Sequence, residues 1–304
     1  MQIRRCAILV LQPREEVNFR VEDLLRGGDG MQRDLGWFAL APHLEAPLRI
    51  SAESQAWLGT LSPTAWTVIS EGDRCAEPAA SLIAVGLVLV RGEPGEAADR
   101  DARLRATYWH PLAAVMHAFS RWEGVDAVRN MRDSDIETAS QMRQTLGAPP
   151  SEAKELAGQR HPLPRAVPGP FDDLLSRRVT CRNFDPERPL PLALLAQVLQ
   201  RTFGSTACQR EGEDLVFLKK NVPSGGGLHP IEAYLVIRNV EGMAPGLYLY
   251  CAAGHELRAV TGATEVDRSF VMDMVGQQHW FADAHALVVL APRFNRTYWK
   301  YRNH

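Results

Sequence analysis

The chain has 304 residues, of which 45% are apolar and 23% are charged. This composition is typical of globular proteins, so it excludes a disordered or fibrous chain and allows more than one domain. The 34 Lys and Arg residues nearly balance the 36 Asp and Glu residues, giving a formal net charge of -2. Such a balance argues against nucleic acid as a partner, because phosphate recognition usually requires a strongly basic surface.

The same inspection argues against membranes, disulfides and metals. No apolar run reaches the roughly 18 residues of a membrane span, and the first twelve residues lack the long apolar region of a signal peptide. The five cysteines are widely spaced and form no CxxC pair, which supports neither a zinc site nor a disulfide framework. We therefore expect a cytoplasmic protein that contacts no membrane and holds no metal.

The first part of the chain reads as a mixture of short strands and helices. A strand is expected over 3–12, a helix capped by Ser51 over 55–61, and a second helix start at Ser62-Pro63. Residues 79–90 indicate a buried helix that runs into a strand, followed by a Gly-Pro-Gly turn region. Three short helices before a hairpin favour a winged-helix-like unit over 1–148, which we expect to bind a peptide or a partner protein.

A helix is expected over 107–121, where His110 and His117 share a face. They are one turn too far apart for the usual pair of ligands at i and i+4, so they read as ordinary helix residues. Six prolines then fall between 149 and 170, which indicates an exposed and fairly stiff linker.

Residues 171–304 predict an α+β domain. A leucine-rich helix is expected over 191–202 and another helix over 265–275. Strands are expected over 214–218, 233–238 and 285–291, and 246–250 pairs with 256–260 as a hairpin.

Two clusters in this second part carry candidate chemistry. The first holds Arg177, Arg178, Thr180 and Arg182, whose guanidinium and hydroxyl donors suit a phosphate; the alternative is a solvated charged segment at a helix end. The second is a loop in which three glycines allow close backbone approach to a ligand; the alternative is a flexible loop. Its residues are Pro223, Ser224, Gly225, Gly226, Gly227 and Leu228, with His229 next to them.

The order of these strings resembles the flavin-binding frame of the nitroreductase superfamily. The run from Pro223 to Glu232, the string Arg238-Asn-Val-Glu-Gly242 and the string Ala244-Pro-Gly-Leu-Tyr-Leu-Tyr250 resemble the streptolysin-type (SagB-type) dehydrogenases of peptide maturation. The resemblance implies FMN as cofactor, with the arginines on its phosphate and the Pro-Ser-Gly loop along the ring and ribityl chain. It also implies oxidation of thiazoline or oxazoline rings to azoles in a ribosomally made precursor peptide, with a YcaO-type cyclodehydratase as partner and a homodimer as assembly.

Relatives of this type place a Lys-Tyr pair near the flavin, and Lys300 and Tyr301 match it. The resemblance implies that Lys300 is the base and that Tyr301 orients the ring or relays the proton; His229 is a weaker candidate for substrate contact. A lysine base needs burial, because an unshifted side chain with a pKa near ~10.4 is mostly protonated. Taken without the resemblance, the pair reads as an exposed lysine and a packing tyrosine at a frayed chain end.

Two other functions stay open. One keeps the flavin but reduces nitro compounds or quinones with NAD(P)H, which does not require Lys300 and Tyr301. The other is a non-catalytic scaffold that binds peptide but holds no flavin, because residues 171–304 are short for this superfamily and suggest a domain that lacks its C-terminal part.

Overall fold

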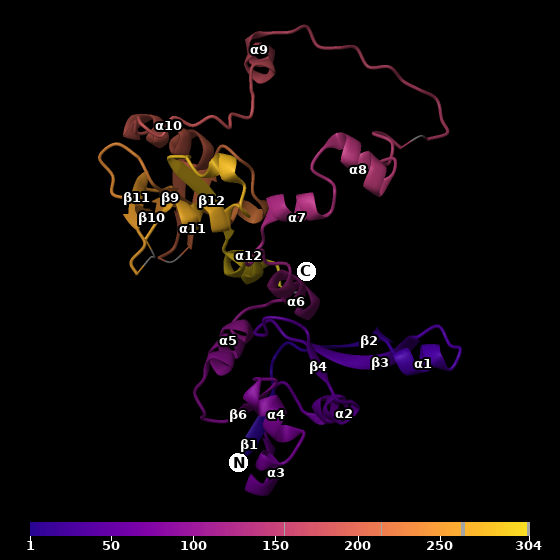
Figure 1. The fold of residues 1–304 in the computed structure, drawn as a ribbon. Helices are drawn as coiled ribbons and strands as arrows, with labels where there is room; N and C mark the ends of the chain where they lie inside the picture. Colours follow the sequence, from indigo (N-terminus) through magenta and orange to yellow (C-terminus); the bar gives the residue numbers. More distant parts are fainter. Residues whose placement is uncertain (155, 214, 263–264, 303–304) are drawn as a thin grey trace. The chain divides into compact units, whose positions relative to one another are not determined.

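The structure is a computed structural model that describes residues 1–304 except 155, 214, 263–264 and 303–304 (Figure 1). It divides into two compact units: Met1–Arg121 together with the segment that begins at Arg293, and Trp122–Pro292. Each unit combines helices with antiparallel sheets, which confirms the expected mixture of α and β structure. The domain limits expected at 148 and 171 stay a prediction.

A three-stranded sheet forms the centre of the first unit. Strand β1 (Gln2–Arg5) lies between β5 (Thr67–Val68) and β6 (Val88–Val90), and all pairs are antiparallel. Three short helices follow the chain around it: α2 (Ala52–Thr60), α3 (Glu71–Cys75) and α4 (Ala79–Ala84). Ile3, Leu58, Leu82 and Leu87 meet in the core of this unit. The winged-helix-like arrangement stays a prediction.

Local side-chain chemistry explains where these helices begin. The Ser51 hydroxyl accepts a hydrogen bond from the Ser54 N–H at 3.0 Å, so the expected cap of α2 is confirmed. The helix expected at Ser62-Pro63 is wrong, because the Ser62 hydroxyl accepts from the N–H groups of Thr64 and Ala65 and holds a turn that leads into β5.

A long hairpin leaves this unit, and we call residues 10–40 the β-arm. Strand β2 (Val10–Phe19) pairs with β3 (Met31–Leu40) from Val10 opposite Leu40 to Phe19 opposite Met31. The short helix α1 (Val21–Leu25) lies at the tip, and β4 (Leu48–Ile50) pairs only with the root of β3 (Figure 1). The single strand expected over 3–12 is wrong, because the chain leaves β1 after Arg5 and enters a second sheet at Val10.

Helices α5 (Glu96–Arg105), α6 (Pro111–Phe119) and α12 (Phe294–Lys300) complete the first unit. Asp101 of α5 is 1% exposed; its carboxylate accepts from the Ala7 N–H and the Arg105 Nε, both at 2.5 Å, and lies 3.6 Å from Arg4 Nη2. Aromatic rings join α12 to His117 of α6 and to Trp109, which lies two residues before α6; on the α12 side they are Phe294 and Tyr298. His117 therefore takes part in ring packing.

A four-stranded antiparallel sheet forms the centre of the second unit, in the order β11-β10-β9-β12. Its strands are β9 (Ile231–Ile237), β10 (Gly246–Cys251), β11 (Glu256–Ala259) and β12 (Ala286–Pro292). Leu235 and Ile237 pack toward α10 (Leu192–Phe203), whereas Val236 packs toward α11 (Arg268–Met274) on the other face. The expected hairpin, the strands expected over 233–238 and 285–291 and the leucine-rich helix are confirmed.

The remaining elements of this unit surround the sheet or precede it. Helices α7 (Ala127–Asp133), α8 (Ala139–Leu146) and α9 (Pro170–Ser176) come first, and the described residues between α8 and α9 form no helix or strand. A two-stranded ribbon of β7 (Ser205–Glu211) and β8 (Leu215–Lys220) leads into the 3-10 turn η1 (Gly225–Gly227), and η2 (His279–Phe281) precedes β12. No described helix combines the length and hydropathy required to cross a membrane.

Candidate functional site

The Pro223–Leu228 loop is a compact turn directly before the central strand β9. Gly226 and Gly227 have φ angles of +63° and +69°, in the left-handed region that only glycine enters at low cost. A Cβ added to Gly227 would lie 3.5 Å from the Phe217 ring, which is ordinary contact. The backbone conformation, and not a lack of space, therefore requires glycine here.

Ser224 and His229 close this loop. The Ser224 hydroxyl accepts a hydrogen bond from the His229 N–H at 2.9 Å, and the Gly227 N–H donates to the Ser224 carbonyl at 3.0 Å. Leu228 is 4% exposed and anchors the turn in the protein, whereas Gly225 and Gly226 are exposed. His229 has a φ of +42°, which is strained for a residue with a Cβ. The loop thus presents exposed glycine backbone on a fixed base.

The arginine segment follows α9 and is open to solvent. Arg177, Arg178 and Thr180 are all exposed, and Arg177 Nε donates to the Asp173 carbonyl at 3.1 Å. Arg182 places its guanidinium 5.6 Å from the centre of the Trp280 ring. Because Trp280 lies just before the strand β12, this contact ties the arginine segment to the sheet of the same unit.

Trp280 itself is a residue that the sequence did not single out. Its indole Nε1 is buried and has no hydrogen-bond partner among the described residues. An unsatisfied buried donor costs roughly 1–3 kcal/mol, so it marks a place where a further acceptor would stabilise the protein. The guanidinium of Arg182 near the same ring favours an anion as that acceptor.

Lys300 and Tyr301 lie at the end of α12, which belongs to the first unit. Lys300 is exposed, and its Nζ lies 5.5 Å from the centre of the Tyr301 ring. Tyr301 is 37% exposed. Helix α12 is held by the ring contacts of Phe294 and Tyr298 with Trp109. Lys300 therefore lacks the burial that a lysine base needs.

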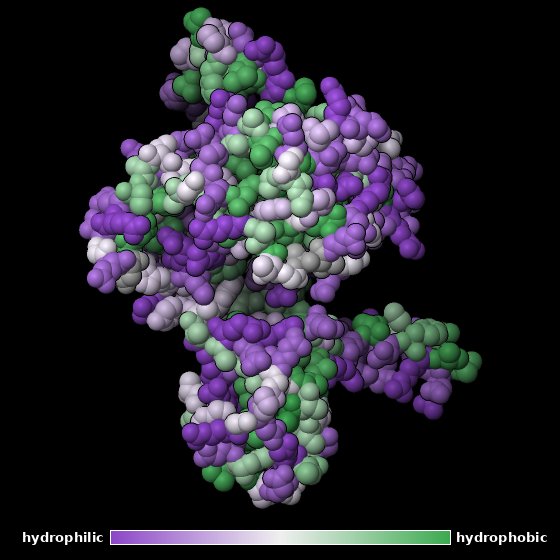
Figure 2. Space-filling model, turned by 90° about the vertical axis from the view of Figure 1, so that its left-hand side faces the viewer, coloured by the Kyte–Doolittle hydropathy of each residue, from purple (hydrophilic) through white to green (hydrophobic). Residues whose placement is uncertain are grey.

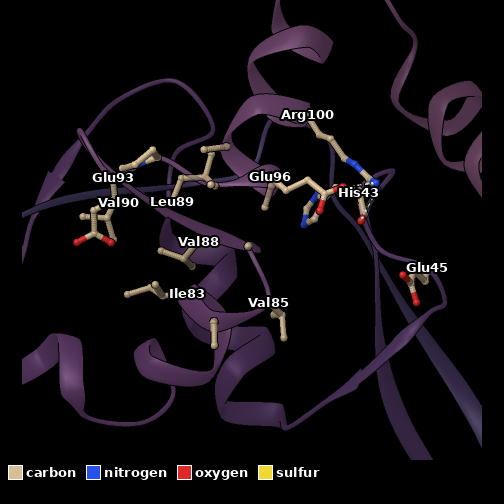
Figure 3. Close-up of a pocket in the computed structure, with 16 residues that line it drawn as sticks. His43, Glu45, Ile83, Val85, Val88, Leu89, Val90, Glu93, Glu96 and Arg100 are labelled. Carbon is tan, nitrogen blue, oxygen red and sulfur yellow. Dashed lines mark hydrogen bonds and ion pairs between the residues drawn. The ribbon is translucent and has the colours of Figure 1, made fainter. Parts of the chain in front are cut away.

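A pocket of about 410 Å³ lies in the first unit beside β6 (Figure 3). Its walls come from α4, β6 and α5, with His43 and Arg100 facing each other on one side. Arg100 donates to the His43 carbonyl at 3.3 Å and is paired with Glu96. Burial lowers the pKa of His43 below its usual 6.5, and its Nε2 has no partner among the described residues. The sequence did not predict this pocket, since His43 lies outside any motif.

Strand β6 is an edge strand of its sheet among the described residues, and its Val90 carbonyl already accepts a hydrogen bond from the Glu93 N–H at 3.3 Å. Cys6 N–H donates to the Leu87 carbonyl and Arg91 N–H donates to the Gln2 carbonyl, so alternate residues of β6 face β1. In an antiparallel pair, the residues between the hydrogen-bonded ones turn their N–H and C=O groups away from the neighbouring strand. The N–H and C=O groups of Val88 therefore point away from β1.

Metal ligands do not converge in the part of the chain that the structure describes. No group of three or more His, Cys, Asp or Glu side chains there has the arrangement of a metal site.

Comparison with known proteins places the second part of the chain in a family. Residues 175–304 match the model of the nitroreductase family, so the C-terminal part carries a nitroreductase-family domain. A protein of Methanocaldococcus jannaschii named "putative nitroreductase" is 28% identical over 127 residues, which are 42% of this chain and 59% of that protein. The chain thus spans less than two thirds of the curated relative it matches.

Two solved structures are similar in part. The crystal structure of a "putative nitroreductase" from Anabaena variabilis is 25% identical in sequence over 35% of this chain and 21% of that chain, with a TM-score of 0.31. The Escherichia coli microcin synthetase McbBCD complex with truncated pro-MccB17 bound shares 18% identity over 68% of this chain and 69% of its own, with a TM-score of 0.37. TM-scores this low do not establish a common fold.

Proposed function

We propose that the C-terminal domain is an FMN-dependent dehydrogenase that oxidises thiazoline or oxazoline rings of a precursor peptide to azoles. The observation that carries the proposal is the Pro223–Leu228 loop, with two left-handed glycines fixed before β9 in a nitroreductase-family domain. The family match supports flavin-type redox chemistry. The strings that follow the loop, which resemble SagB-type dehydrogenases, support the azoline substrate.

The residues present fit FMN chemically. The exposed guanidinium groups of Arg177, Arg178 and Arg182 suit the phosphate, since arginine offers paired donors to phosphate oxygens. Gly225 and Gly226 leave backbone open to a flat ring, because no side chain stands on them. The Trp280 Nε1, which has no hydrogen-bond partner among the described residues, adds a further donor in the ring that Arg182 contacts. All of these groups belong to the second unit.

The proposed reaction removes two hydrogens from the ring. A bound flavin supplies the acceptor for the hydride that leaves the ring β-carbon. We propose that Lys300 takes the proton from the ring α-carbon and that Tyr301 orients the ring or passes that proton on. Lys300 has to be neutral for this step, so the bound peptide has to shield it from water. His229, fixed by Ser224, is proposed as a weaker substrate contact.

The first unit is proposed to bind the precursor peptide. The position of β6 at the edge of its sheet, beside the pocket of Figure 3, supports this role, because an extended peptide can add to an edge strand through main-chain hydrogen bonds. A YcaO-type cyclodehydratase, which would form the azoline, is the proposed partner, and the proposed assembly is a homodimer.

Purified full-length chain tests the proposal. We expect the protein to retain FMN with its visible absorption, and we expect incubation with a thiazoline peptide to lower the peptide mass by two hydrogens. Lys300→Met is expected to retain FMN and lose azole formation, whereas Lys154→Met in the region before α9 changes neither. Nitro reduction with NADH and no azole formation would favour a reductase. Failure to bind FMN would favour the scaffold.

A further inference from the structure

The outer half of the β-arm exposes apolar residues on one face, and most polar residues of its other face are half-buried. Opposite residues of an antiparallel pair share a face, so Glu15 and Leu35, Val17 and Arg33, and Phe19 and Met31 lie together. Phe19 is 62% exposed and Leu35 70% exposed. We call the six residues of these three pairs the apolar face of the arm.

The opposite face is polar and already satisfied within the chain. Arg14 places its guanidinium 4.8 Å from the Phe38 ring, and Glu16 pairs with Arg49 at 2.8 Å. Arg14 and Glu16 are half-buried, whereas Glu15 and Val17 are exposed. This is the reverse of the usual pattern, in which a half-buried sheet turns its apolar side inward. The apolar face is therefore the side of the arm that is prepared for contact.

The tip of the β-arm also exposes apolar residues. Helix α1 has no buried residue, and Val21, Leu24 and Leu25 are all exposed, Leu25 to 81%. Figure 2 shows this arm with hydrophobic residues gathered at its end. A two-stranded hairpin is at best marginally stable alone in water. Contiguous exposed apolar surface of this kind usually marks an interaction site.

We propose that the apolar face of the β-arm binds the same face of a second copy of this chain. The charges in the face carry this choice of partner: it holds one carboxylate, Glu15, and one guanidinium, Arg33, whose atoms lie 3.5 Å apart within the chain. Both side chains are more than half exposed. In a two-fold interface each contact occurs twice, so a contact of Glu15 with the partner's Arg33 is matched by a contact of Arg33 with the partner's Glu15. A uniformly acidic or basic partner would match one of these charges and repel the other.

Charge reversal tests this symmetry directly. Glu15→Arg leaves two cations in the face and Arg33→Glu leaves two anions, so each variant repels its own copy. We expect sedimentation across micromolar concentrations to show at least about tenfold weaker self-association for each variant alone. Mixed together, the two variants match again, and we expect a heteromeric species with nearly the original affinity. Repair within one chain cannot produce that result, because each chain carries only one of the two changes.

The control is Asn18→Arg, which places the same arginine side chain on the opposite face of the same strand. It is expected to associate like the unmodified chain. If the unmodified chain also dimerises through another surface, the reversals remove one step of assembly, and the mixture restores that step.

Crosslinking gives a readout that no other interface can imitate. With the exposed Cys75, Cys181 and Cys208 changed to serine, Val17→Cys is expected to form an intermolecular disulfide on mild oxidation and the neighbouring Asn18→Cys is not. Equal crosslinking of both positions, or single reversals that associate like the unmodified chain, would overturn the proposal. So would a mixture that associates no better than its components. Flavin content and azole formation are separate measurements, so this result is independent of the proposed function.

Discussion

Strand β9 and the β-arm are both antiparallel β structure, yet they are buried in opposite ways. β9 lies between two strands and has packed side chains on both faces, with Leu235 and Ile237 at 0% exposure and Val236 at 1%. The outer half of the arm has one neighbouring strand and no core on either face. Strand β9 and the β-arm therefore share antiparallel hydrogen-bond pairing and differ in how far their side chains are buried.

This difference locates rigidity and adaptability in different places. The proposed ligand loop lies directly before β9 and inherits the stability of a strand that cannot shift without opening two cores. The arm has few buried contacts, so its order depends on what binds it. A cofactor site needs rigid surroundings, whereas a surface that binds a partner tolerates adaptable ones.

The largest expected effect separates the two regions. Leu235→Ala removes a fully buried side chain from β9 and is expected to lower the free energy of unfolding by about 2–5 kcal/mol. Leu35→Ala in the arm removes an exposed side chain and is expected to change the free energy of unfolding of the monomer by less than about 0.5 kcal/mol. Urea denaturation at low protein concentration compares the two. Similar losses would mean that the arm is packed in solution.

A second test concerns ion pairs instead of apolar residues. Asp101→Ala leaves Arg105 and Arg4 without their carboxylate and frees the Ala7 N–H just before the arm, which is expected to cost about 3 kcal/mol. The exposed arm pair is the control, since Glu15→Ala is expected to cost less than about 1 kcal/mol in the monomer. Thermal unfolding of both variants measures the difference. A stable Asp101→Ala protein would show that the contacts of the Asp101 carboxylate contribute little to the free energy of unfolding.

A third test addresses the loop before β9. Gly226→Ala forces a Cβ into the left-handed region and is expected to cost about 1–2 kcal/mol and to weaken FMN retention. Gly59→Ala near the end of α2 has open space around it and no positive φ, so it is expected to be neutral or to stabilise by up to about 1 kcal/mol. Denaturation and flavin titration of the pair test whether the loop conformation is needed. Unchanged flavin binding in Gly226→Ala would contradict the proposed ligand contact.

The smallest expected effect is a pH dependence in the first unit. Burial lowers the pKa of His43 in the folded protein, so below pH 6.5 the unfolded chain binds a proton that the folded chain resists. Stability is therefore expected to fall as pH decreases through 6.5, by at most about 1.4 kcal/mol per pH unit from this group. His43→Gln is expected to remove that part of the slope. Denaturation between pH 5 and pH 8, roughly the range in which histidine titrates, measures it. Identical slopes would mean that His43 is solvated.

Much of the second unit could be predicted from sequence because its signals are local. The apolar run of β9, the turn between β10 and β11 and the leucine spacing of α10 each indicate one structure. Strand β7 could not, since Ser205–Glu211 is almost wholly exposed and owes its conformation to pairing with β8. The outer arm was missed because charged residues interrupt the alternation of apolar and polar residues that indicates a strand.

The candidate site was only partly predictable. Three successive glycines indicate an unusual backbone, and the left-handed angles of Gly226 and Gly227 agree with that. The contact of Arg182 with Trp280 joins residues almost one hundred positions apart, and the aromatic packing that holds α12 joins Trp109 to Phe294. No local pattern reports such distant partners. The roles of the arginines and of Lys300 and Tyr301 stay predictions.

Strand β12 has a practical consequence for anyone who handles this protein. It pairs with β9 along one side and is the outermost strand of its sheet among the described residues, with Leu290 58% exposed. A flat edge of the sequence Ala-Leu-Val-Val-Leu-Ala is a template on which another chain can add, which leads to aggregation. We expect the chain to lose solubility on concentration and Leu290→Lys to improve its recovery, because a lysine on an edge strand discourages such addition.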